Sequence, residues 1–72
     1  TNARRLMTVW LNGEAADARG AGNVAELAAR YGLHPHTILI EHNGTALHQR
    51  EWISCPLAEN DRLEFIRVVA GG

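Results

Sequence analysis

The sequence contains one cysteine, no lysine and no long apolar run. A single thiol, Cys55, cannot form an internal disulfide, and an unpaired cysteine is typical of a reducing compartment. The apolar runs are much shorter than the roughly 18 residues that a membrane-spanning helix needs. A signal-peptide pattern is also missing, and we therefore expect a cytoplasmic protein.

Concentrated charge is missing as well. The formal net charge is −1 and the seven arginines are scattered, whereas a nucleic-acid partner requires a concentrated basic face. The sequence therefore predicts no nucleic-acid partner. Four histidines are present, but their spacing matches no compact set of metal ligands, and we predict no bound metal. They are His34, His36, His42 and His48.

A length of 72 residues fits one domain, of which 46% is apolar. A core this small is marginal without disulfides or metals, so the fold must depend on efficient packing. Because Met7 stands just before the first regular pattern, we expect residues 1–6 to be a cloning remnant or a disordered lead. We assign the folded domain to residues 7–70 and a flexible di-glycine tail to residues 71–72.

Two turn signals divide the strand pattern of the domain. Asn12-Gly13 and Asn43-Gly44 both favour two-residue hairpin turns, because asparagine and glycine tolerate the positive φ that these turns require. Alternating or β-branched apolar residues flank each turn. Strands are predicted over 8–12, 14–18, 37–42, 45–47 and 62–69, with one short helical turn within 50–57.

One amphipathic helix is predicted between the two hairpins. Asn23 can cap it, Glu26 can reach back to the cap backbone as in a capping box, and Gly32 can end it. Its apolar stripe, at the spacing i, i+3, i+4 and i+7, consists of Val24, Leu27, Ala28 and Tyr31. This order of elements predicts an α+β fold, in which the helix packs on one face of a mixed four- or five-stranded sheet.

The last residues of the sequence, Ala70, Gly71 and Gly72, contribute little to a folded core, because the glycines have no side chain. A backbone without Cβ atoms suits a narrow channel in a partner protein. The alternative is a frayed terminus that happens to end in glycine. By itself, a Gly-Gly dipeptide is a weak motif.

Motifs spread over residues 7–72 give this tail a context. They are Leu11-Asn12-Gly13-Glu14, the helix with Val24 and Leu27, Ile40-Glu41 before Asn43-Gly44, Arg50-Glu51-Trp52, Leu57, Asp61-Arg62-Leu63 and Val68-Val69-Ala70-Gly71-Gly72. In their order and spacing, the sequence resembles the ThiS family of bacterial sulfur carriers, which have the ubiquitin-like β-grasp fold. One departure is His42, where an apolar residue is expected beside the Asn-Gly turn.

This resemblance implies a carrier cycle at the carboxylate of Gly72, with Ala70 and Gly71 threading into the partner. A ThiF-type adenylating enzyme would use ATP and Mg²⁺ to form an acyl-adenylate, and a persulfide sulfur donor would convert it to a thiocarboxylate. The sulfur would then pass to a ThiG-type thiazole synthase in thiamin biosynthesis. The chain would be a protein substrate and not an enzyme, and it would bind no cofactor of its own.

Strand parity predicts a surface for these partners. If Val9 and Leu11 face the helix, Trp10 faces the opposite side of the sheet. Ile66 and Val68 of the last strand would face that side as well. First and last strands are neighbours in a β-grasp sheet, so these three side chains are predicted to form one exposed apolar patch. The alternative is a strand bulge near Arg67, which would redirect Val68 or Val69.

Other polar and aromatic residues receive a structural explanation. Trp52 is predicted to fill the small core, and Cys55 to be a partly buried, inert thiol. The acidic residues Glu59, Asp61 and Glu64 either pair with arginines of the activating enzyme or form a solvated charged face.

Three alternative functions share these features. The small subunit of molybdopterin synthase has the same tail and chemistry, although the compact length and Arg50-Glu51-Trp52 favour the thiamin carrier. A protein modifier joined through Gly72 to lysines of other proteins is the second alternative, and a ubiquitin-like binding module with an idle tail is the third. Self-conjugation through lysine is excluded, because the chain has none.

Overall fold

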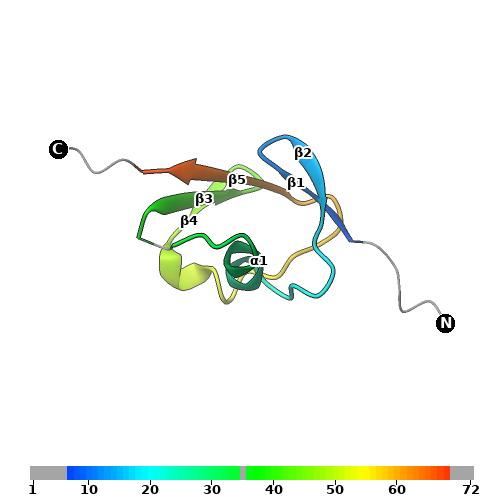
Figure 1. Cartoon of the computed structure of the whole chain (residues 1–72), viewed down its shortest axis with the longest axis horizontal. Helices are drawn as coiled ribbons and strands as arrows, with labels where there is room; N and C mark the ends of the chain where they lie inside the picture. Colours follow the sequence, from blue (N-terminus) through cyan, green and yellow to red (C-terminus); the bar gives the residue numbers. More distant parts are fainter. Residues whose placement is uncertain (1–6, 35, 69–72) are drawn as a thin grey trace.

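The computed structural model describes residues 7–34 and 36–68, and the predictions made for residues 1–6 and 69–72 lie outside the described residues. The described elements follow one another in the predicted order, and most bounds agree within one or two residues (Figure 1). They are β1 (Thr8–Leu11), β2 (Glu14–Asp17), α1 (Val24–Arg30), β3 (Ile38–His42), β4 (Thr45–Leu47), the 3-10 turn η1 (Gln49–Glu51) and β5 (Arg62–Arg67).

The five strands form one mixed sheet in the order β2-β1-β5-β3-β4. β1 and β5 run parallel, whereas the other neighbouring strands are antiparallel. Figure 1 shows α1 lying against one face of this sheet, with the opposite face uncovered. The predicted α+β architecture of the β-grasp type is therefore confirmed, with five strands.

Both predicted hairpin turns form where the Asn-Gly dipeptides stand. Asn12 and Gly13 have φ angles of 51° and 86°, and Asn43 and Gly44 have φ angles of 51° and 87°. Such left-handed pairs match the twist of the strands that they join. The first turn limits β1 to four residues, which leaves β1 shorter than the neighbouring β5.

The helix begins as predicted but is capped in a slightly different way. The Asn23 side chain accepts a hydrogen bond from the Glu26 backbone N–H at 2.8 Å. The Glu26 carboxylate, however, accepts from the backbone N–H of Gly22 at 2.6 Å, one residue before the expected cap position. The N–H of Val24 donates to the carbonyl of Cys55, which ties the start of the helix to the loop before β5. The predicted capping box is corrected accordingly.

The core lies between α1 and the inner face of the sheet. Val24, Leu27 and Ala28 of the predicted helical stripe are buried, whereas Tyr31 at its end is 47% exposed. Full burial of an aliphatic side chain contributes about 1.5–3 kcal/mol, so a few such residues decide the stability of so small a domain. The largest fully buried side chains are Leu27, Ile40, Leu63, Val9 and Val24.

Trp52 fills the core as predicted, with 4% of its surface exposed. It follows η1, and its backbone carbonyl accepts from the N–H of Ala25 at the start of the helix. Its indole N–H has no acceptor within residues 7–34 and 36–68. Among the described residues, no helix is long and apolar enough to span a membrane.

Candidate functional site

The predicted reactive end, formed by Ala70, Gly71 and Gly72, lies outside the described residues, but the strand leading to it is described. β5 runs through the middle of the sheet and ends at Arg67. The N–H of Val68 still donates to the carbonyl of Thr37 at 2.8 Å, which extends the pairing with the β3 side by one residue. The folded domain thus fixes the chain up to Val68.

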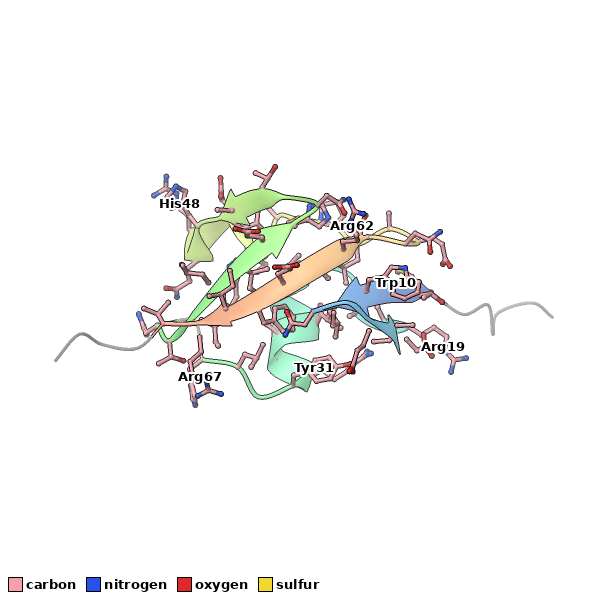
Figure 2. All side chains as sticks on the ribbon, turned by 90° about the horizontal axis from the view of Figure 1, so that it is seen from above. Trp10, Arg19, Tyr31, His48, Arg62 and Arg67 are labelled. Atoms are coloured by element: carbon pink, nitrogen blue, oxygen red, sulfur yellow. The ribbon has the colours of Figure 1, made fainter. Side chains whose placement is uncertain are left out.

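The three predicted partner residues are all exposed on the outer face, the side of the sheet opposite α1. The exposed fractions of Trp10, Ile66 and Val68 are 38%, 40% and 44%. Trp10 is in register with Arg62, and Figure 2 shows these two residues together near the start of β5. Ile66 lies four positions after Arg62, which is about 13 Å along the strand. The face therefore carries two apolar areas instead of the single patch predicted.

Leu39 is an exposed partner of Ile66 that the sequence analysis did not identify. The two residues are in direct register across β3 and β5, and Leu39 is 52% exposed. Val68 lies two residues beyond Ile66 on the same face, so Leu39, Ile66 and Val68 form one group, here called the terminal patch. The register continues residue by residue to Arg67, and the N–H of Val68 donates to Thr37, so no bulge redirects Val68, whereas Val69 lies outside the described residues.

Charged residues adjoin the terminal patch. Glu41 and Glu64 are in direct register on β3 and β5, one step from the Leu39 and Ile66 pair on the same face. Neither carboxylate has an ion pair among the described residues. Like charges directly opposite each other on a sheet are destabilising, and a basic group of a partner would relieve this repulsion. Of the three predicted acidic residues, Glu64 is the one exposed on the outer face.

Asp61 has an internal role instead of the predicted exposed one, and it is only 8% exposed. Its carboxylate accepts from the Ala58 backbone N–H at 2.9 Å and from the Asn43 side chain at 3.1 Å, and it lies 2.8 Å from His42 Nε2. Burial alone would raise the pKa of the Asp61 carboxyl, but the hydrogen bonds from His42, Asn43 and Ala58 lower it overall. Asp61 is thus neither available to a partner nor part of a solvated face.

This contact also explains the departure at His42. An apolar side chain was expected beside the second turn, and His42 instead pairs with the buried carboxylate. Glu59 is engaged as well, since its carboxylate accepts from the N–H of Thr8 at 3.2 Å. Both interactions join the start of β5 and the loop before it to the rest of the sheet.

Cys55, the one cysteine of the chain, is poorly suited to act as a nucleophile. Burial raises the pKa of the Cys55 thiol, and the nearby carboxylates of Asp61 and Glu51 raise it further. The thiol is therefore protonated at neutral pH, and a thiol is a much weaker nucleophile than a thiolate. Among the described residues, no three His, Cys, Asp or Glu side chains are grouped closely enough to hold a metal ion.

Comparison with known proteins assigns the chain to a family. The model of the ThiS family matches residues 9–72. The crystal structure of the thiamine biosynthesis protein (ThiS) from Geobacter metallireducens is similar, with a TM-score of 0.76 and 28% sequence identity. The similarity covers 92% of this chain and 100% of that protein.

A second relative extends over the whole chain. It is the uncharacterized protein ycf40 of Trieres chinensis, which is 22% identical over 72 residues, or 100% of this chain and 99% of that protein. The family match spans both hairpins, the helix, β5 and the two last glycines. The chain therefore belongs to the ThiS family of small sulfur carrier proteins.

Proposed function

We propose that the chain carries sulfur as a thiocarboxylate on Gly72 and delivers it for formation of the thiazole of thiamin. The observation that carries this proposal is the family match, which extends over residues 9–72 and so includes Gly71 and Gly72. The thiamin assignment is supported by the similarity to a protein named for thiamine biosynthesis.

The first proposed step activates a poor electrophile. An oxygen of the Gly72 carboxylate attacks the α-phosphorus of ATP, and pyrophosphate leaves, which produces an acyl-adenylate. ATP and Mg²⁺ are bound by a ThiF-type adenylating enzyme and not by this chain. The activated carbonyl carbon then carries AMP, a good leaving group.

The second proposed step introduces sulfur. The terminal sulfur of a persulfide attacks the carbonyl carbon and displaces AMP, and a thiol cleaves the resulting acyl disulfide. This cleavage releases the thiocarboxylate and a disulfide. A thiocarboxylate is a strong nucleophile, suited to sulfur transfer on a ThiG-type thiazole synthase.

The described part of the molecule supplies a docking surface for this chemistry. Four residues follow Val68, and an extended segment of that length reaches at most about 14 Å. A partner that holds Gly72 in its active site must therefore contact the folded domain near the end of β5. The terminal patch of Leu39, Ile66 and Val68 lies at that end.

Catalysis in this proposal belongs to the partners. The protonated Cys55 thiol and the internally paired Asp61 are poorly placed for acid, base or nucleophilic roles. The chain contributes its terminal carboxylate and the surface by which it is recognised.

Intact-protein mass spectrometry tests the proposal. The chain is incubated with a ThiF-type enzyme, ATP, Mg²⁺ and a persulfide donor, beside a variant that lacks Gly72. The expected result is a mass gain equal to one oxygen exchanged for sulfur, which is absent from the truncated variant. An unchanged mass, with an enzyme proven active on another carrier, would refute the sulfur-carrier chemistry.

Purification from cells separates the related functions. Co-purification with a thiazole synthase supports the thiamin role, whereas co-purification with a large molybdopterin synthase subunit would replace it. Covalent adducts on lysines of other proteins would instead indicate a protein modifier.

A further inference from the structure

Strand β5 has two neighbouring strands at its start and only one at its end. β3 pairs with it from Leu63 to Arg67, whereas β1 is in register only with Arg62 and Leu63. β1 stops there because the chain turns back at Asn12-Gly13. Figure 1 and Figure 2 both show β5 continuing beyond the hairpin of β1 and β2. The last part of this central strand is therefore an edge.

Some of the backbone N–H and carbonyl groups on this edge of β5 are hydrogen-bonded, and others are not. The carbonyl of Leu63 accepts from the N–H of Asn12, and the N–H of Phe65 donates to the Asn12 side chain at 2.9 Å. Asn12 thus imitates one further residue of β1. Beyond it, within the described ranges, the carbonyl of Phe65 and the N–H and carbonyl of Arg67 have no partner. These three groups are here called the free edge.

A groove of about 770 Å³ lies beside the free edge, on the side of the sheet that carries α1, and its lining combines apolar side chains with the polar residues Asn12, Glu14 and Arg67. Tyr31 and Phe65 form part of its wall, with their ring centroids 6.5 Å apart. Figure 2 shows Tyr31 and Arg67 on the same side of β5. The groove is further lined by Leu11, Ala16 and Leu33.

We propose that an extended segment of the adenylating enzyme pairs with the free edge of β5 and places an apolar side chain in this groove. Strand addition of this kind combines main-chain hydrogen bonds with pockets for alternate side chains. The inference rests on the proposed function, because it concerns the partner that takes up the tail.

The path of the chain identifies this occupant. Four residues follow Val68 in the sequence, and the end of β5 is the last described part of the chain before them, so a partner that takes up Gly72 must lie close to this end of the strand. The free edge lies at this end of the strand, within reach of such a partner. Pairing there fixes the direction of β5 and thereby limits where the terminal carboxylate can lie. A second copy of this chain is the competing occupant, and the test includes it.

Amide hydrogen exchange of Arg67 is the direct measurement. In the chain alone this N–H has no acceptor among the described residues, whereas the N–H of Val68 is already bonded to Thr37. In complex with the ThiF-type enzyme, exchange at Arg67 should slow at least tenfold, with a smaller change at Val68. Unchanged exchange at Arg67 in a saturated complex would overturn the inference.

A pair of variants at Arg67 provides the second arm. Arg67→Pro removes the free N–H without removing a bond to β3, because Arg67 faces the edge and not β3. Arg67→Ala removes the same charge and keeps the N–H. We expect the proline variant to bind the enzyme at least tenfold more weakly than the alanine variant, with both circular dichroism spectra unchanged.

The two proposals fail in different ways. If the unaltered chain gains sulfur and the two Arg67 variants bind equally well, the strand pairing is wrong and the carrier function stands. If the unaltered chain gains no sulfur, the carrier function fails first. Protection of Arg67 in the chain alone, together with a dimeric mass in solution, would assign the free edge to a second copy.

Discussion

The two ends of β5 differ in how completely the rest of the molecule surrounds them. At the start, the carbonyl of Asp61 accepts from Trp10 and the carbonyl of Arg62 accepts from Asn43, while Leu63 is fully buried. At the end, β3 is the sole neighbouring strand in the described part of the chain, and Ile66 and Val68 are exposed.

This difference separates stability from recognition along a single strand. The start contributes buried apolar area and satisfied hydrogen bonds, which hold the small domain together. The end offers exposed apolar side chains and unused backbone groups, which contribute little to folding and are available to a partner. Substitutions at the two ends should therefore act on different measurements.

The largest expected effect comes from the buried end. Leu63→Ala removes a fully buried side chain, and the resulting cavity should lower the free energy of unfolding by about 2–5 kcal/mol. Val68→Ala, on the same strand at 44% exposure, should lower it by less than about 1 kcal/mol. Urea denaturation followed by circular dichroism measures both.

Binding should rank these two variants in the opposite order. Val68→Ala is expected to weaken binding to the adenylating enzyme, because Val68 belongs to the terminal patch. Leu63→Ala should leave binding nearly unchanged at a temperature where the variant is folded. Equal losses of stability at both positions would contradict the division of β5 into two ends.

The next effect concerns the carboxylate that secures the start of β5. Asp61→Asn keeps the shape of the side chain but loses its charge and part of its capacity to accept hydrogen bonds. The free energy of unfolding should fall by about 1–3 kcal/mol at neutral pH. Chemical denaturation at a series of pH values measures this difference.

The pH dependence follows from the lowered pKa of Asp61. A carboxyl group with a lower pKa in the folded state stabilises fully above its unfolded pKa of about 3.8. This contribution is lost as the pH falls through the lowered folded-state pKa. The stability difference between the natural chain and Asp61→Asn should therefore shrink in acid, and a constant difference would exclude ionised Asp61 as its source.

A smaller effect tests the division of the outer face into two apolar areas. Leu39 and Ile66 are in direct register, so their alanine substitutions should be coupled in enzyme binding by at least about 0.5 kcal/mol. Trp10 and Ile66 are separated along β5, and their substitutions should add within about 0.3–0.5 kcal/mol. Isothermal titration calorimetry of the single and double variants measures both. Coupling between Trp10 and Ile66 would instead support the prediction that both residues belong to one apolar patch.

Local sequence signals predicted most of the fold. The Asn-Gly dipeptides determine both hairpins because few other residues adopt the required positive φ at low cost, and Asn23 identifies the start of the helix. The resemblance to a family then predicted that the first and last strands are neighbours, and the structure confirms this pairing of β1 with β5. The Glu26 carboxylate accepts from the N–H of Gly22 and not from that of Asn23, because sequence spacing does not determine which nearby N–H a flexible side chain reaches.

Contacts between distant parts of the chain could not be predicted from local sequence patterns. His42 and Asp61 lie 19 residues apart, and no local pattern around either residue predicts their contact. Leu39 stands in an uninterrupted apolar run, which does not indicate which face of the sheet each residue occupies. The register between β3 and β5 shows that Leu39 lies on the outer face. The free edge likewise depends on two lengths, because β1 has four residues and β5 has six.

The smallest expected effect is an increase in the free energy of unfolding, in contrast to the decreases predicted for the buried residues. Glu41 and Glu64 are directly opposite each other beside the terminal patch, and such like-charged pairs destabilise a sheet. Glu64→Gln should therefore raise the free energy of unfolding by a few tenths of a kcal/mol at low salt, and less at high salt. In a Glu41→Gln background, the same substitution should have no stabilising effect.

The same substitution also tests why such a pair is tolerated. If a basic group of the adenylating enzyme relieves the repulsion, Glu64→Gln should stabilise the free chain and weaken the complex, measured by calorimetry at two salt concentrations. A variant that is more stable and also binds more tightly would show that the acidic pair takes no part in recognition. Recognition would then depend on the terminal patch and the free edge alone, which the Leu39 and Arg67 variants measure separately.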